Sequence, residues 1–123
     1  MIIKIPFKTP TINHLYWHRG NMKIMKTEAK ELREQIEDVI LKSVSYLDRE
    51  ELKKQKLDVV VEIFEDWLTK SGDIKRKDIQ NREKFLVDSV FNSLDIDDKH
   101  IFKCCFEKKQ SLEDYAIITI RKM

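Results

Sequence analysis

The sequence predicts an α/β or α+β fold, with a mixed sheet of about four strands and two main helices on one face. Segments with strand and helix periodicity follow each other in the order strand, helix, strand, helix, strand, strand. The chain has 123 residues, of which 41% are hydrophobic, so it has the size and apolar content for one core. We therefore expect a single domain over residues 1–123.

The first half of the chain is expected to hold a short strand and a long helix. Residues 2–6 alternate as in a strand, and the stretch that follows is irregular, with Gly20-Asn21 as its turn signal. The helix begins at about Thr27, and the charged residues 48–56 extend or follow it. Its apolar residues have the spacing of one buried helix face; they are Ala29, Leu32, Ile36, Val39, Ile40 and Leu47.

The second half holds the remaining strands and a second helix. Residues 57–64 are rich in β-branched side chains, which is typical of a central strand, and residues 66–77 are expected to form a loop. A helix over 79–94 follows, and strands over 100–106 and 115–120 end the chain. The buried face of this second helix is expected to carry Leu86, Val87, Val90 and Leu94.

Several classes of protein are excluded by the composition. No apolar run approaches the roughly 18 residues of a membrane span, and the N-terminus lacks the features of a secretory signal. The two cysteines, Cys104 and Cys105, are neighbours in a predicted strand, so their side chains point to opposite faces. This arrangement favours buried free thiols over a disulfide framework or a zinc site. We expect a cytoplasmic protein with no membrane partner.

The net charge of +2 conceals a strong segregation of charge. Residues 1–27 contain five basic and no acidic residues, and residues 70–84 contain six basic and three acidic ones. Residues 85–98, by contrast, hold four aspartates and no basic residue. Basic segments beside carboxylates suit phosphodiester chemistry, because the bases bind phosphates and the carboxylates bind a divalent cation. The alternative is that these segments are merely solvated.

Four segments, in order and in register, resemble the RusA family of Holliday-junction resolvases. Residues 5–16 are similar to the family's strand-end PPSxNxxY segment, and residues 27–30 to the start of its first helix. Residues 76–88 match its most specific segment, R-R-D-x-D-N-x-x-K-x-x-x-D, and residues 97–101 its DD-x-Q-V stretch. The resemblance covers nearly the whole chain. It implies a small, dimeric, RusA-like domain that cleaves DNA with the help of Mg²⁺, for which Mn²⁺ is a substitute.

The resemblance also implies a set of site residues. The family's three catalytic aspartates fall on Asp78, Gln80 and Asp98 and its lysine on Lys84, so the candidate catalytic residues are Asp78, Asp98 and Lys84. With Asp97 next to Asp98, the candidate metal ligands are Asp78, Asp98, Asp97 and Gln80. Gln80 departs from the family, which has an aspartate there, and an amide oxygen brings no negative charge to Mg²⁺. Two outcomes remain open. Asp97, Asp95 or Asp88 compensates for the lost charge, or the protein binds junctions without cleaving them efficiently.

Contacts with branched DNA are expected from the basic segments and from polar residues near them. The candidate DNA-binding residues are Lys75, Arg76, Lys77, Asn81, Asn13, Tyr16 and Arg19. A four-way junction has near two-fold symmetry and needs two opposed cuts, so a homodimer would place one site at each strand. Tyr16 and Trp17 are candidates for stacking on an unpaired base, although core packing is an equal alternative for one of them and for Trp67.

Each candidate has a structural alternative when it is taken alone. Asp78 is a suitable N-cap for the second helix, Lys84 and Asp88 form an ordinary i,i+4 pair, and residues 95–98 form a polar turn. A helix of about sixteen residues is roughly 24 Å long, so its two ends do not meet by themselves. For Asp78 and Asp98 to share a metal, the chain after the helix has to fold back along it. An α/β domain with an unrelated role is the remaining alternative.

Overall fold

The main sheet has four strands, which lie in the order β1 (Ile2–Ile5), β6 (Tyr115–Lys122), β4 (Leu57–Glu65) and β5 (Ile101–Gln110). The computed structural model describes residues 1–9, 16–19, 22–25, 27–77 and 80–123, and only the backbone of residues 16–19, 22–25, 80 and 81. Its elements are β1 (Ile2–Ile5), β2 (Tyr16–Arg19), β3 (Met22–Met25), α1 (Thr27–Ser43), α2 (Tyr46–Leu52), β4 (Leu57–Glu65), α3 (Gln80–Leu94), the 3₁₀ turn η2 (Asp98–His100), β5 (Ile101–Gln110) and β6 (Tyr115–Lys122).

The predicted mixed sheet of four strands is confirmed. β4 pairs with β5 in parallel and with β6 antiparallel, and β1 pairs antiparallel with β6 at the edge. Burial along β4 alternates strictly, because every second side chain points into the core. The parallel pair requires a crossover, and α3 supplies it between β4 and β5. The two ends of α3 therefore lie near the two ends of the sheet.

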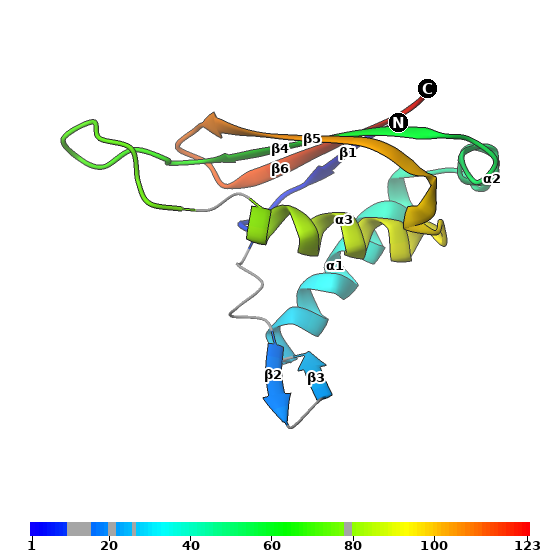
Figure 1. Ribbon diagram of the computed structural model, residues 1–123, viewed down its shortest axis with the longest axis horizontal. Coiled ribbons are helices and arrows are strands. Elements are labelled where there is room, and N and C mark those ends of the chain that lie inside the picture. Colours follow the sequence, from blue (N-terminus) through cyan, green and yellow to red (C-terminus); the bar gives the residue numbers. More distant parts are fainter. Residues whose placement is uncertain (10–15, 20–21, 26, 78–79) are drawn as a thin grey trace.

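Helices α1 and α3 cover one face of the sheet, as predicted (Figure 1). The core between the two layers includes Ile36 and Ile40 of α1, Leu86 and Val90 of α3, and Val61 of β4, all fully buried. The first residue lies beside the last strand of the chain, since the Met1 amino group donates to the Ile120 carbonyl of β6 (2.9 Å). No helix in the described ranges is long and apolar enough to cross a membrane.

Two local expectations are corrected by the structure. Residues 16–19 and 22–25, expected to be irregular, form the antiparallel hairpin β2–β3, which Figure 1 shows at the N-terminal end of α1. Leu47 is 78% exposed, because α1 ends at Ser43 and a second helix starts after Ser45, whose hydroxyl accepts from the Asp48 amide. The new helix breaks the periodicity that assigned Leu47 to the core.

The cysteines are free thiols on opposite faces of β5, but only one of them is sheltered. Cys104 is half-buried against α3, whereas Cys105 is exposed, so the expectation of two buried thiols was wrong for Cys105. Burial raises the pKa of the Cys104 thiol to about 11, with the nearby Glu83 carboxylate adding to the shift. A thiol of such high pKa is a poor nucleophile at neutral pH.

Candidate active site

A buried carboxylate organises the start of α3. Glu65, the last residue of β4, is 1% exposed, and its side chain pairs with two cations. One is the Lys77 ammonium, 2.8 Å from Glu65 Oε2, and the other is the Arg82 guanidinium, itself 5% exposed. Lys77 and Arg82 stand on either side of residues 78–81, which contain two of the predicted metal ligands. Glu65 therefore ties both flanks of that segment to the end of β4.

Trp67 packs its ring beneath three cationic side chains near this carboxylate, which we call the cation cluster. Its ring is 4% exposed, and its Nε1–H donates to the Ile63 carbonyl (3.1 Å), which settles its role as core packing. Three cationic groups lie over the ring: Lys108 Nζ at 4.9 Å, Arg82 Cζ at 5.4 Å and Lys77 Nζ at 5.8 Å from its centroid. Such cation–π contacts stabilise cationic side chains next to the ring, where they are partly shielded from water.

Further basic side chains surround this cluster. The pKa of Lys8 is lowered by burial and by the charges of Lys77, Arg82 and Lys75, while Asp114 raises it, so Lys8 lies near these cations. Lys108 also donates to the Lys77 carbonyl (2.7 Å). Mutual repulsion among cations is relieved when an anion binds between them. The start of α3 is therefore suited to bind the phosphates of a nucleic acid.

The predicted DNA-binding residues lie at this end of the molecule wherever the structure describes their side chains. Arg76 is exposed, and the Lys75 ammonium lies 3.2 Å from the Asp66 carbonyl. Among the remaining candidates, Asn13 lies outside the described residues, and so do the side chains of Asn81, Tyr16 and Arg19. The backbones of Tyr16 and Arg19 belong to β2, and the backbone of Asn81 to the first turn of α3.

Of the predicted catalytic residues, Lys84 and Asp98 are described and Asp78 is not. Lys84 is exposed in the first turns of α3. Its neighbour Glu83 has a raised pKa because its carboxylate is partly buried against β5, where it accepts from the Cys104 thiol at 3.7 Å. Gln80 is the first residue of α3, and its side chain lies outside the described part of the chain.

Carboxylates gather at the other end of α3. Asp88, Asp97 and Asp98 line an open pocket of about 330 Å³, the acidic pocket, together with Arg33, Phe91, Asn92 and Ile96. Asp97 caps η2 by accepting from the Lys99 amide (2.9 Å), and this hydrogen bond lowers the pKa of its carboxyl group. Asp98 is exposed at the start of η2. Arg33 reaches this pocket from α1 and donates to the Ser89 hydroxyl (3.3 Å).

Asp95 has a different role from its acidic neighbours. It adopts a left-handed conformation (φ 56°) just after α3, and the Ile96 amide donates back to the Phe91 carbonyl (3.0 Å). This is the usual way to end a helix, with an aspartate in place of the more common glycine. The Asp95 carboxylate pairs with Lys53 at 3.3 Å and lines, with Asp97, an adjoining pocket that does not include Asp98. Asp88 and Asp97 are therefore better placed than Asp95 to assist Asp98.

The two ends of α3 are far apart within one chain. The helix has 15 residues and is therefore about 22 Å long. Lys108, near the end of β5, contacts Lys77, whereas Asp98 precedes the first residue of that strand. The chain does turn back across the sheet as β5, but only after Asp98. Within one chain, the described residues thus place Asp98 at the opposite end of α3 from Gln80, and the metal site shared by Asp78 and Asp98 stays a prediction.

The carboxylates of the acidic pocket suit Mg²⁺ in kind but not in arrangement. Aspartate oxygens are the ligands that Mg²⁺ prefers. Within the described residues, however, no group of three or more His, Cys, Asp or Glu side chains is arranged to hold a metal ion. Asp78 and the Gln80 side chain lie outside those residues. The acidic pocket would therefore need a donor from elsewhere to hold an ion firmly.

Sequence reasoning missed Glu65, Arg82, Lys108, Lys8 and Arg33. The positive charge of residues 1–27 pointed to the region of Lys8, but no local pattern indicates that Glu65 meets Arg82.

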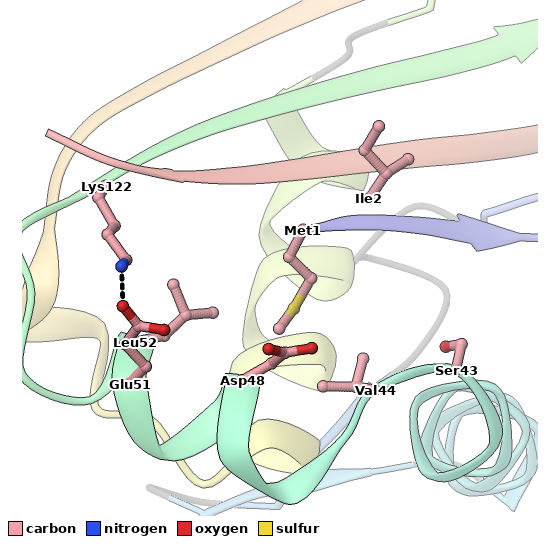
Figure 2. A pocket seen from close by; sticks show the side chains of 8 residues that line it. All are labelled: Met1, Ile2, Ser43, Val44, Asp48, Glu51, Leu52 and Lys122. Atoms are coloured by element: carbon pink, nitrogen blue, oxygen red, sulfur yellow. Dashed lines mark hydrogen bonds and ion pairs between the residues drawn. The ribbon is translucent and has the colours of Figure 1, made fainter.

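Another pocket of about 330 Å³ lies between α1, α2 and the sheet edge, lined by Met1, Val44, Asp48, Glu51, Leu52 and Lys122 among others (Figure 2). It contains none of the predicted site residues.

Fold and site define a small α+β domain with a cluster of cationic side chains at one end of a helix and a carboxylate pocket at the other. Comparison with protein families adds that the model of endodeoxyribonuclease RusA matches residues 6–121. The chain therefore belongs to the RusA endodeoxyribonuclease family, which confirms the resemblance in the sequence. No curated protein matches the chain.

Proposed function

We propose that the protein is a Mg²⁺-dependent endodeoxyribonuclease that resolves Holliday junctions and other branched DNA by paired phosphodiester hydrolysis. The family match over nearly the whole chain carries this proposal. The cation cluster around Trp67 and the acidic pocket at η2 support it, because lysine and arginine side chains bind phosphates and aspartate oxygens bind Mg²⁺. The protein would act as a cytoplasmic homodimer, with Mn²⁺ able to replace Mg²⁺.

A second chain would complete the site. Lys77 and Gln80 flank Asp78 at the start of α3, whereas Asp98 lies past the end of that helix. In a two-fold dimer, any contact between the start of one helix and the end of its partner occurs twice. Two α3 helices in antiparallel contact would thus form two equal sites, each with Asp78 from one chain and Asp98 from the other. Such a dimer supplies one site for each strand to be cut.

The residues would divide the work as follows. Asp78 and Asp98 would hold Mg²⁺, with Asp97 and the Gln80 amide oxygen as further ligands. When bound, the ion neutralises charge on the scissile phosphate and makes a nucleophile available at neutral pH. Lys84 would stabilise the negative charge that develops on the phosphate in the transition state. Lys75, Arg76 and Lys77 would hold the neighbouring phosphates, with Asn81, Asn13, Tyr16 and Arg19 as further contacts.

A weakly active or non-cleaving junction-binding protein is the second candidate. Gln80 favours it, because the family has a charged ligand at this position and the amide contributes none. Restoring the carboxylate separates the candidates. We expect Gln80→Asp to increase the cleavage rate at low Mg²⁺ by about 10-fold. The measurement is the Mg²⁺ dependence of the single-turnover rate, with Gln35→Asp, the same change at an exposed position of α1, as control. Equal rates for wild type and Gln80→Asp would show that another ligand already compensates.

The proposed activity is tested on a synthetic four-way junction. We expect cleavage of opposed strands with Mg²⁺ or Mn²⁺, no cleavage with EDTA, and at least about a 10-fold preference over linear duplex of the same sequence. Gel analysis of end-labelled strands gives the cut positions. Tight binding without cutting would support the second candidate. Equal affinity for junction and duplex would contradict both.

A further inference from the structure

Residues 66–77, which follow β4, form a structured hairpin that projects beyond the end of the sheet (Figure 1). Leu68 and Ile74 form an antiparallel bridge. The bridge is flanked by hydrogen bonds from the Thr69 amide to the Asp73 carbonyl (2.7 Å) and from the Lys75 amide to the Trp67 carbonyl (2.9 Å). In this pattern the bridged residues are a non-hydrogen-bonded pair, whose side chains approach each other most closely. Leu68 and Ile74 are therefore an apolar pair on one face.

The tip of the hairpin is held by its own polar groups. Gly72 has φ 88°, a conformation that suits glycine, and its amide donates to the Thr69 carbonyl (2.9 Å). The Thr69 hydroxyl accepts from the Asp73 amide (3.0 Å), and the Ser71 hydroxyl donates to the Asp73 carboxylate (3.0 Å). These bonds give the tip a defined shape before any partner binds.

The base of the hairpin is attached to the sheet. Gln110, the last residue of β5, accepts from the Trp67 amide and donates to the Asp66 carboxylate, each at 2.9 Å. The buried Trp67 ring completes the attachment. These contacts fix the base of the hairpin to the β4–β5 end of the sheet, next to the cation cluster.

The surface of this hairpin combines an apolar point with positive charge. Ile74 is 78% exposed and Leu68 37% exposed. Residues 66–77 contain four Lys or Arg against two Asp, and Lys75 and Arg76 directly follow Ile74. Leu47, also 78% exposed, lies instead on α2 next to Asp48, Glu50 and Glu51. Of the two, only the surroundings of Ile74 are compatible with approach to DNA.

We propose that the pair Ile74 and Leu68 is a wedge that enters the branch point of a DNA junction. Lys70, Lys75 and Arg76 would bind the phosphates on either side of the opened step. Apolar side chains inserted in this way unstack bases, and a branch point is already partly unstacked, so insertion costs less there than in duplex. The wedge rests on the proposed function and goes beyond it, because it assigns selectivity for branched DNA to a hairpin outside the cleavage site.

The test measures binding and base unstacking without cleavage. A four-way junction carrying 2-aminopurine at the branch point is titrated in EDTA, beside a junction labelled in mid-arm and a linear duplex. We expect wild type to raise the branch-point fluorescence, and Ile74→Ala to remove most of that rise. The Ile74→Ala preference for junction over duplex should fall about 5- to 10-fold, with duplex affinity unchanged. Ile74→Met, which keeps an apolar side chain of similar size, should retain the wild-type signal.

Two control variants separate the wedge from general effects. Leu47→Ala truncates an equally exposed apolar residue and should change nothing, and Arg76→Gln should weaken junction and duplex equally. An Ile74→Ala protein with wild-type fluorescence and selectivity would overturn the wedge while leaving the proposed cleavage intact. Equal loss of junction and duplex affinity in Ile74→Ala would also overturn it. A wild-type protein that does not prefer junctions would overturn the wedge together with the proposed function.

Discussion

Asp98→Asn chains are expected to cut four-way junctions at least about 100-fold more slowly than wild type, and mixing them with Asp78→Asn chains is expected to restore nicking. The amide keeps the size of the carboxylate and removes its charge, so Mg²⁺ loses a ligand while the fold is unchanged. The same loss is expected for Asp78→Asn alone. Restoration by mixing follows from the position of Asp98 at the far end of α3 from Gln80.

The mixed dimer distinguishes a shared site from a site within one chain. If each site takes Asp78 from one chain and Asp98 from the other, both substitutions fall in the same site of the mixed dimer. The second site then has both aspartates and nicks one strand. If both ligands came from one chain, each site of the mixed dimer would carry one substitution and neither would cut.

The experiment requires co-expression with two tags, so that only mixed dimers are purified. The readout is nicking of one strand per junction, as opposed to the paired cuts of wild type. Asp95→Asn is the matched control, because Asp95 lies near Asp98 in sequence but pairs with Lys53 and lines an adjoining pocket that does not include Asp98. It should cut at nearly the wild-type rate. Mixed dimers as inactive as their parents would contradict the shared site.

The parts of the fold that were predictable depend on local patterns. β4 is recognisable because strand periodicity and β-branched residues agree along its whole length. α3 is recognisable because its apolar residues form one stripe that packs on the sheet. The break between α1 and α2 was not predicted, since Ser45 competes with the helix by capping a new one, and an apolar residue such as Leu47 fits either arrangement.

The candidate site was predictable in composition but not in arrangement. The family motif identified Asp98 and Lys77, and the charge pattern identified the segments that carry them. The distance between the two residues depends on where the chain turns back after α3, and neighbouring residues do not encode that point. The pairing of Glu65 with Arg82 was equally hidden, because it forms only when the crossover places the start of α3 against the end of β4.

Glu65→Gln is expected to lower the free energy of unfolding by about 3–5 kcal/mol, the cost of leaving a buried charge unpaired. Arg82 is 5% exposed and would lose the carboxylate that compensates its charge. Urea denaturation followed by circular dichroism measures the change. Glu62→Gln, on the same strand, is the matched control, since its partner Lys109 is 3.8 Å away and more exposed. The control should cost no more than about 1 kcal/mol.

The double variant Glu65→Met with Arg82→Met separates the fold from the site. Replacing both partners of a buried ion pair by apolar groups is often close to neutral, so most of the lost stability should return. Junction cleavage should not return, because Lys77 and Arg82 would no longer be tied to β4 on either side of residues 78–81. Recovery of stability without activity would therefore show that the ion pair positions the start of α3. Recovery of both would show that Glu65 is needed only to neutralise Arg82.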